Sequence, residues 1–268
     1  MTGAPGPGAA VVHGPAVHGP AVHGTAVQAT AQLEIAVQDA AGARAAAAGG
    51  AARVELCTAL RMGGLTPSQG TVEAVLESAG RAGFVHALVR SRAGGYVYSA
   101  EEVDTMCREI RLLKAAGVHG VVVGALTAAR TIDLAALEQW VEAADGLPVT
   151  FHRALDACAD PLGQLDRLAG RGVGRVLTSG GAVRSIDGLA VLAAMASNGP
   201  DGVQIMAGGG VRIQDIGALV AAGVDAVHLS AREPFVDQHP AGPGGGAQEL
   251  DATSLDLVGR ARRAIHAR

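Results

Sequence analysis

Short apolar runs alternate with longer helical stretches along most of the chain. Eight runs rich in β-branched and other apolar residues are predicted to be strands, at residues 33–37, 53–58, 85–91, 120–126, 148–154, 175–181, 203–210 and 226–232. Stretches rich in Ala, Leu, Glu and Arg lie between these runs, and a further one follows at 251–266. Strands that alternate with helices are typical of α/β folds with a parallel sheet. Eight such units predict a single (β/α)8 domain, the TIM barrel, over residues 31–268.

Helix boundaries along the chain support this order. Ser99 and Glu102 have the spacing of a capping box, and Thr66 is predicted to cap a helix whose first residue is Pro67. A helix end, a glycine and a strand recur in LLKAAGVHGVVVG, RLAGRGVGRVLTSG and LVAAGVDAVHLS. The alternative is an open, doubly wound sheet, which usually has about six strands and a GxGxxG motif after the first one. No such motif follows residues 33–37, so the barrel is favoured.

Residues 1–30 differ from the rest of the chain. They contain the five-residue repeat VHGPA, VHGPA and VHGTA, and a period of five fits neither a helix nor a strand. Because Gly-Pro steps break both elements, this segment is predicted to be a disordered, low-complexity tail. His13, His18 and His23 could alternatively form a loose metal site.

Composition excludes several classes of function. The formal charge is −4, from 21 basic and 25 acidic residues, and only six residues are aromatic (Phe 3, Tyr 2, Trp 1). This argues against a nucleic-acid binder, which needs a basic surface or a stacking platform. Lys114 is the single lysine and lies near the end of a predicted helix. A Schiff-base aldolase, a pyridoxal phosphate enzyme and a P-loop NTPase each need a placed lysine, so no organic cofactor is predicted.

The cysteines and the lengths of the apolar runs indicate the cellular compartment of the protein. Cys57, Cys107 and Cys158 are widely spaced and form neither a disulfide framework nor a CxxC clip. The first basic side chain is Arg44, which argues against a signal peptide, and no apolar run reaches the roughly 20 residues of a membrane span. We therefore expect a cytoplasmic protein without membrane partners.

Polar residues late in the predicted strands form the candidate catalytic set. The active site of a TIM barrel lies at the carboxyl ends of its strands, and strand parity selects the side chains that face inward. These considerations place Glu34, Glu55, Arg90, His152 and His228 at one barrel mouth. Structural alternatives remain open: Glu34 or Glu55 could pair with Arg90 to fill the interior, and His152 could be a hydrogen-bonded core histidine.

A second group of residues predicts an anion site. Gly208, Gly209 and Gly210 follow the seventh run, and Ser230 follows the eighth, where barrels often bind phosphate through backbone N–H groups. Thr178 and Ser179 at the end of the sixth run are added to this set, and Arg92 with Arg90 resembles a clamp for a carboxylate or phosphate. A tight turn with positive φ is the alternative explanation of the glycines.

Several long motifs identify a family. The segments RVELCTALRMGGLTPSQG, VRSRAGGYVYS, PVTFHRALDACADP, RVLTSG, IMAGGGV and HLSAR closely resemble the CutC family, in its order and over roughly residues 32–232. The resemblance implies a cytoplasmic TIM barrel with a role in copper homeostasis and copper binding. Within that resemblance Cys57 is the candidate metal ligand. Members commonly carry a second cysteine on the first strand, where this chain has Ala36, and a proline and an acidic residue where it has Ser91 and Gly95.

Two hypotheses follow from the sequence. One is a CutC-like copper homeostasis protein that binds copper through Cys57, although a lone strand cysteine is more often a small buried side chain. The other is a barrel enzyme of unassigned reaction that acts on a small anionic or phosphorylated metabolite. In it Arg90 and Arg92 would hold the anion, and His152 or Glu55 would act as general acid or base. A homo-oligomer is compatible with either, although no segment specifies an interface.

Overall fold

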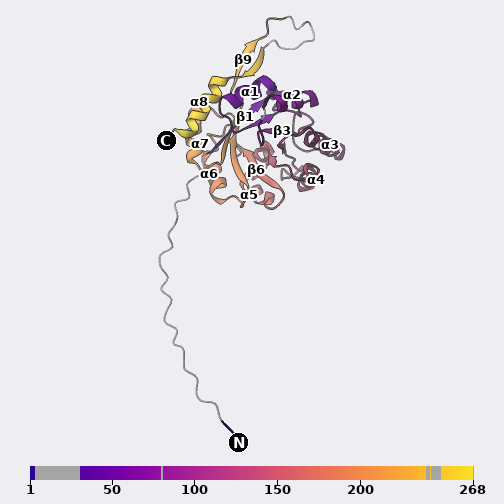
Figure 1. Cartoon of the computed structure of the whole chain (residues 1–268), viewed down its shortest axis with the longest axis vertical. Helices are drawn as coiled ribbons and strands as arrows, with labels where there is room; N and C mark the ends of the chain where they lie inside the picture. The colour runs from indigo at the N-terminus through magenta and orange to yellow at the C-terminus, as the bar shows by residue number, and fades with distance from the viewer. Residues whose placement is uncertain (4–30, 80, 240–241, 243–248, 268) are drawn as a thin grey trace.

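The computed structural model describes residues 1–3, 31–79, 81–239, 242 and 249–267. Its centre is a closed barrel of eight parallel strands in sequence order (Figure 1). The strands are β1 (Gln32–Val37), β2 (Arg53–Leu56), β3 (Val85–Leu88), β4 (Gly120–Val123), β5 (Val149–Phe151), β6 (Val173–Thr178), β7 (Gln204–Gly208) and β8 (Ala226–Leu229). The predicted TIM barrel is confirmed. The expected tail lies outside the described residues, apart from its first three.

Helices connect successive strands and surround the barrel (Figure 1). They are α1 (Ala40–Ala48), α2 (Gln69–Ala79), α3 (Ala100–Ala116), α4 (Leu134–Ala144), α5 (Pro161–Leu165), α6 (Leu189–Asn198), α7 (Ile216–Ala221) and α8 (Leu255–His266). The capping box of α3 is present, since Ser99 Oγ accepts the Glu102 N–H and Glu102 accepts the Ser99 N–H. Among the described residues no helix is both long and apolar enough to cross a membrane.

The predicted start of the second helix is wrong. Helix α2 begins at Gln69, and Ser68 Oγ accepts the N–H of Thr71. Thr66 instead connects neighbouring segments, because its hydroxyl donates to Glu109 on α3 and accepts the backbone N–H of Arg90. A hydroxyl before a proline can cap a helix or join two segments in this way, and the sequence pattern does not distinguish these uses.

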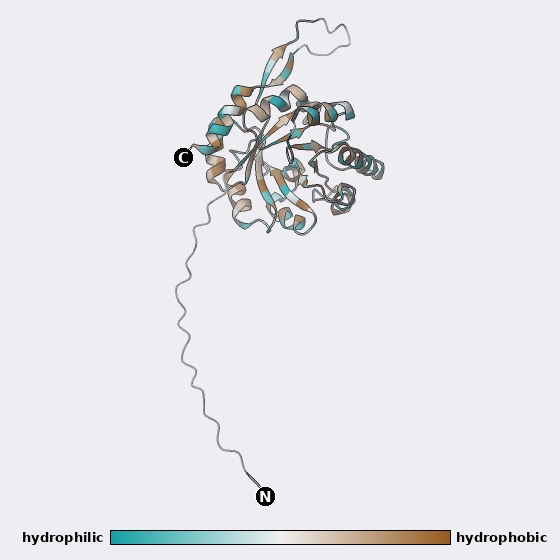
Figure 2. Ribbon diagram, in the orientation of Figure 1, coloured by the Kyte–Doolittle hydropathy of each residue, from teal (hydrophilic) through white to brown (hydrophobic). Residues whose placement is uncertain are grey.

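Outward-facing strand residues form the apolar core between barrel and helices. The largest fully buried side chains include Trp140, Phe84 and Phe151, and the indole N–H of Trp140 donates to the Val103 carbonyl. Hydrophobic residues predominate in the barrel strands, whereas the surrounding helices carry both hydrophobic and hydrophilic residues (Figure 2). This arrangement keeps the barrel rigid, so the residues at the strand ends have a fixed support.

A hairpin that the sequence did not predict follows the barrel. Strands β9 (Arg232–Val236) and β10 (Glu249–Thr253) pair antiparallel and extend away from the barrel (Figure 1). The predicted run 226–232 therefore ends early, and Arg232 begins β9 instead. Asp251 on β10 accepts hydrogen bonds from Arg61 after β2 and from Arg232, which ties the hairpin to the barrel mouth.

Candidate functional site

A cavity of about 620 Å³ opens at the carboxyl ends of the strands. Four of the five residues predicted to be catalytic line it, namely Glu55, Arg90, His152 and His228. The fifth, Glu34, is fully buried and contacts His228 from within the barrel. The side chains of β1, β2 and β8 therefore converge as strand parity predicts, and Glu34 lies below the cavity, in register with Arg53 and His228.

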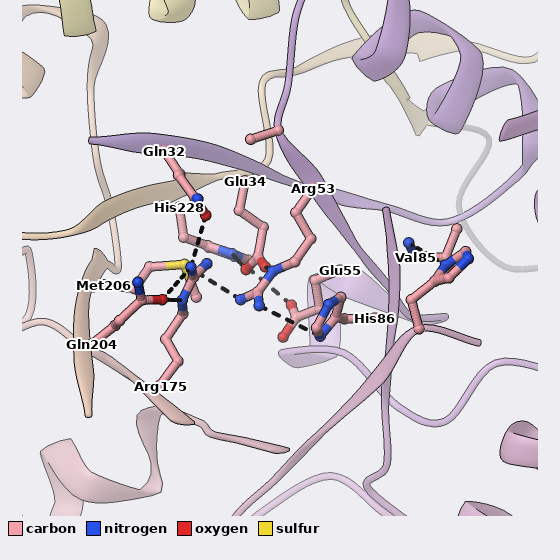
Figure 3. Close-up of polar contacts among 12 residues, drawn as sticks. Gln32, Glu34, Arg53, Glu55, Val85, His86, Arg175, Gln204, Met206 and His228 are labelled. Carbon is pink, nitrogen blue, oxygen red and sulfur yellow. Dashed lines mark hydrogen bonds and ion pairs between the residues drawn. The ribbon is translucent and has the colours of Figure 1, made fainter. Parts of the chain in front are cut away.

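Glu34 belongs to a network of buried charges inside the barrel (Figure 3). Glu34 forms an ion pair with Arg53 through one carboxylate oxygen, and its other oxygen lies 2.7 Å from Nδ1 of His228. Burial alone would raise the pKa of Glu34, but Arg53 and His228 together hold it far below the usual range. Arg53 also lies 3.4 Å from Nδ1 of His86 and 3.9 Å from the sulfur of Met206. Glu34 is thus a permanent anion that orients His228.

Glu55 and His228 lie next to each other at the cavity floor. Oε2 of Glu55 lies 3.8 Å from Nε2 of His228, and Ala36 lines the cavity next to both, paired in register with Glu55. Burial raises the pKa of the Glu55 carboxyl, and the charge of Glu34 adds to the rise. Burial opposes a charge on His228 as well, yet the hydrogen bond to Glu34 and the charge of Glu55 raise its pKa. Glu55 therefore holds a proton more readily than a free carboxyl group does, and His228 more readily than a free imidazole.

His152 presents one free polar atom. Its Nδ1 accepts the backbone N–H of Ala154 at 3.1 Å, so in the neutral ring the proton is on Nε2. Nε2 is buried and has no hydrogen-bond partner among the described residues. Burial, reinforced by the charge of Arg90, lowers the pKa of His152 to about 3. The ring is therefore a neutral hydrogen-bond donor on the cavity wall.

Arg90 and Arg92 are largely occupied by loop backbone. The two Nη atoms of Arg90 donate to the carbonyls of Met62, Gly64 and Gly94, which leaves only Nε without a partner. Arg92 forms an ion pair with Glu102 and lies 4.9 Å over the ring of Tyr98. It is absent from the cavity lining. The two arginines fasten the loops after β2 and β3, which differs from the expected anion clamp.

Thr178 and Ser179 are also engaged elsewhere. Asp156 accepts the Thr178 hydroxyl at 2.6 Å, the Ser179 N–H at 2.9 Å and the Gly181 N–H at 3.1 Å. The Asp156 carboxylate thus fills the group of donors that the sequence assigned to a bound anion. Neither Thr178 nor Ser179 lines the cavity, so this part of the expected anion site is not where the sequence placed it.

The loops after β7 and β8 keep free donors at the cavity rim. The N–H groups of Gly209, Gly210, Val211 and Ser230 have no hydrogen-bond partner within the described part of the chain. All four residues line the cavity. Gly208 lies just below, packed so closely that a β-carbon would be 2.3 Å from Leu177 Cδ1.

Arg153, from the turn after β5, also belongs to this rim. It begins a short 3-10 turn after β5, where its Nε donates to Asp156 and its Nη2 to the Ser179 hydroxyl. Its guanidinium lies over Gly209, since a β-carbon there would be 2.6 Å from Cζ. The sequence did not predict Arg153 as part of the candidate site. The usable signal was a glycine with φ of +115° opposite a loop arginine, which only the fold brings together.

Cys57 does not offer a suitable metal site. Its side chain is fully buried with Leu88, Val122 and Leu60. Burial, with the charge of Glu55 as a second cause, raises the pKa of the thiol far above its usual range. Copper binds the thiolate, and no cluster of three or more potential metal ligands of the His, Cys, Asp or Glu type occurs among the described residues. The residues around Cys57 therefore do not fit a bound copper ion.

Two buried histidines are expected to make the protein less stable in mild acid. Burial and neighbouring arginines hold the pKa of His86 and of His152 at about 3, whereas each ring takes up a proton near 6.5 in the unfolded chain. Below about pH 6.5 each ring should cost roughly 1 kcal/mol per pH unit. The raised pKa values of Glu55 and His228 offset part of this loss, because the folded forms of both groups keep a proton that the unfolded forms release.

Urea unfolding at about pH 7 and about pH 5.5 measures this effect. His152→Asn keeps an acceptor for the Ala154 N–H but does not titrate, so its midpoint should fall less between the two pH values than that of the wild type. Equal losses in the two proteins would show that His152 is not held neutral by the fold.

The fold and cavity define a TIM-barrel protein with a buried carboxylate–histidine network at its mouth. A sequence model of the CutC family matches residues 31–233, and the chain belongs to this family. The family protein CutC of Porphyromonas gingivalis (strain W83) is 38% identical over 232 residues, which cover 83% of this chain and 93% of that one. The corresponding protein of Pasteurella multocida (strain Pm70) is 38% identical over 192 residues, covering 71% and 78%.

A solved structure agrees with this assignment. The CutC protein of Streptococcus agalactiae, described as a candidate copper homeostasis protein, superposes with a TM-score of 0.70. It is 27% identical and covers 75% of this chain and 98% of its own. The resemblance seen in the sequence motifs is therefore confirmed.

Proposed function

We propose that this chain is a barrel enzyme that binds a small phosphate-bearing metabolite and transfers a proton within it. The observation that carries the proposal is the pair Glu55–His228, which lies at the floor of a cavity whose rim has free N–H groups and Arg153. Acid–base catalysis needs a group with a pKa near the working pH next to a bound substrate. Glu55 and His228 both line the cavity, and the pKa of each is raised above its ordinary value, which supports this role.

The anion would bind at the loops after β7 and β8. Free N–H groups at Gly209, Gly210 and Val211, together with the guanidinium of Arg153, are donors that match a phosphate. Gly210 has a φ of +59° and Gly209 of +115°, so side chains at either position would strain the loop. The tight-turn explanation accounts for the positive φ but not for the unpartnered donors.

The expected link to copper comes from the family and not from the residues of this cavity. The S. agalactiae relative is described as a candidate copper homeostasis protein, and the same role is our expectation for this chain in the cell. Cys57 is enclosed by apolar side chains, and the first-strand position where the family commonly has cysteine is Ala36. We therefore propose that a role in copper homeostasis would arise from the chemistry at the cavity and not from copper held by Cys57.

A thermal-shift titration of the purified full chain tests the proposed function. Inorganic phosphate and glycerol 3-phosphate should raise Tm in a saturable manner, because a ligand that binds only the folded state stabilises it by mass action. Sodium chloride at matched ionic strength is the control for general salt effects. The absence of a specific shift with either phosphate probe would contradict the proposal.

The Cys57→Ser variant should bind Cu(I) as the wild type does. In the wild type the Cys57 thiol is buried, and its raised pKa disfavours the thiolate that copper needs. Competition with bicinchoninate, a coloured Cu(I) chelator, measures the number and affinity of bound ions, and Cys107→Ser is the matched control. Loss of one bound Cu(I) in Cys57→Ser alone would restore copper binding as the direct function.

A further inference from the structure

We propose that the reaction at this site is the reversible removal of a proton from a carbon next to a carbonyl group. The substrate class is a phosphorylated aldehyde or ketone, such as a small sugar phosphate. This inference rests on the proposed function, because the phosphate would hold the substrate at the rim while the reacting carbons reach the floor. It goes further in naming the bond that breaks and the two residues that act on it.

His152 supplies the group that would polarise the carbonyl. The Ala154 N–H fixes the ring as the Nε2–H tautomer, and Nε2 is the buried atom without a partner among the described residues. The ring cannot easily turn, because Gly124 lies against it: a β-carbon there would be 2.4 Å from Nδ1. Tyr96 packs on it with ring centroids 5.1 Å apart. A neutral imidazole held in this way donates to a carbonyl oxygen without giving up its proton.

Glu55 supplies the base. No hydrogen bond to its carboxylate exists among the described residues, although it lines the cavity. His228 is the neighbour that can exchange its proton, and Glu34 keeps that imidazole oriented through Nδ1. The small side chain of Ala36 lies in register with Glu55 and lines the cavity, so it leaves room for a substrate carbon. A carboxylate without a hydrogen bond, next to an imidazole that can exchange its proton, has the properties of a general base.

Removal of the proton needs no reactant other than the substrate and these side chains. Glu55 accepts the proton, the C–H bond breaks, and its electron pair forms the carbon–carbon double bond of an enolate. The carbonyl electron pair moves to oxygen, which accepts the hydrogen bond from Nε2 of His152. Return of a proton from Glu55 to the carbon regenerates the substrate, and exchange of that proton through His228 replaces it with one from solvent.

Covalent routes fit the residues less well. An amine catalyst would need a lysine, and Lys114 lies on α3, where it donates to the Asp145 carbonyl at 2.8 Å. Lys114 is the single lysine of the chain. A thiol catalyst would need a thiolate, and Cys57 is buried with a raised pKa. Direct proton transfer is therefore the reaction that the groups at the cavity support.

Proton NMR in D2O tests the inference with the full chain. The probes are dihydroxyacetone phosphate, D-fructose 6-phosphate and D-ribulose 5-phosphate, each followed for loss of the proton signal next to its carbonyl. We expect enzyme-dependent exchange with at least one probe, and a rate that falls by about 100-fold or more in Glu55→Gln. Arg171→Met, prepared in parallel, controls for contaminating enzymes and should exchange at the wild-type rate.

The role of His152 has its own matched pair of variants. His152→Gln can place an amide N–H near the position of Nε2, whereas His152→Asn keeps only the acceptor for Ala154. Exchange should therefore be lost in the Asn variant and partly retained in the Gln variant. Equal exchange in both would overturn the role assigned to Nε2.

Binding of the same probes, measured in parallel by thermal shift, separates two kinds of failure. Probes that bind without any exchange overturn the proton-transfer inference and leave the proposed anion site intact. Probes that do not bind at all overturn the proposed function and the inference with it. Exchange at the wild-type rate in Glu55→Gln would also overturn the inference.

Discussion

The Glu34→Gln variant is expected to unfold at a much lower urea concentration than the wild type. Glu34 is fully buried, and its two oxygens contact Arg53 and His228. Removing one partner of a buried ion pair leaves the other charge uncompensated, which typically costs about 3–5 kcal/mol. Circular dichroism during urea unfolding at neutral pH measures the shift.

An exposed ion pair provides the control for this prediction. Glu138 pairs with Arg171 on the surface, where the two side chains are 60% and 38% exposed. Exposed pairs contribute little because water and salt screen them, so Glu138→Gln should not shift the midpoint measurably. A second test is Glu34→Met with Arg53→Met, which removes both charges and should recover part of the lost stability. Equal midpoints for wild type and Glu34→Gln would contradict a stabilising role of the Glu34–Arg53–His228 network.

The Arg153→Met variant is expected to bind inorganic phosphate about 10- to 100-fold more weakly than the wild type, as for the loss of a hydrogen bond to a charged group. The guanidinium of Arg153 lies over Gly209, next to the free N–H groups of the same loop. Asp156 keeps its bonds from Thr178, Ser179 and Gly181, so the loop after β6 should stay in place. Isothermal titration calorimetry measures the affinity.

Arg171→Met is the matched control for this variant. The Arg153 and Arg171 side chains are 39% and 38% exposed, and each forms one ion pair. Arg171 precedes β6, whereas Arg153 contacts Ser179, which follows β6. Only Arg153 lines the cavity. The control should bind phosphate with wild-type affinity. If both variants lose affinity to the same extent, the effect comes from net charge and not from the proposed site.

Strand parity predicted much of the barrel interior. A closed parallel barrel fixes which residues face inward, so Glu55, His152 and His228 could be placed at the cavity from their positions alone. Arg53 faces the same interior as Glu55, two residues earlier on β2. It was missed because only residues late in each strand were considered, although the network around Glu34 depends on it.

Hydrogen-bond partners across loops could not be predicted in the same way. Asp156 reaches Thr178 and Ser179 from a turn more than twenty residues away in sequence, and parity says nothing of such a contact. Arg92 contacts Glu102 and Tyr98, and strand parity does not predict these contacts either. The hairpin of β9 and β10 was missed because each strand is stabilised by the other across a Gly/Pro-rich stretch. Neither strand has an apolar run of its own.

We propose that the loops after β7 and β8 bind a phosphate at the cavity rim. An ¹H–¹⁵N NMR titration of the full chain with inorganic phosphate tests it most directly, because the free N–H groups of Gly209, Gly210 and Val211 report their own hydrogen bonding. We expect these resonances to shift together and saturate, and the same titration of Arg153→Met to need much more phosphate. Saturable shifts confined to other parts of the chain, or no shifts at all, would contradict it.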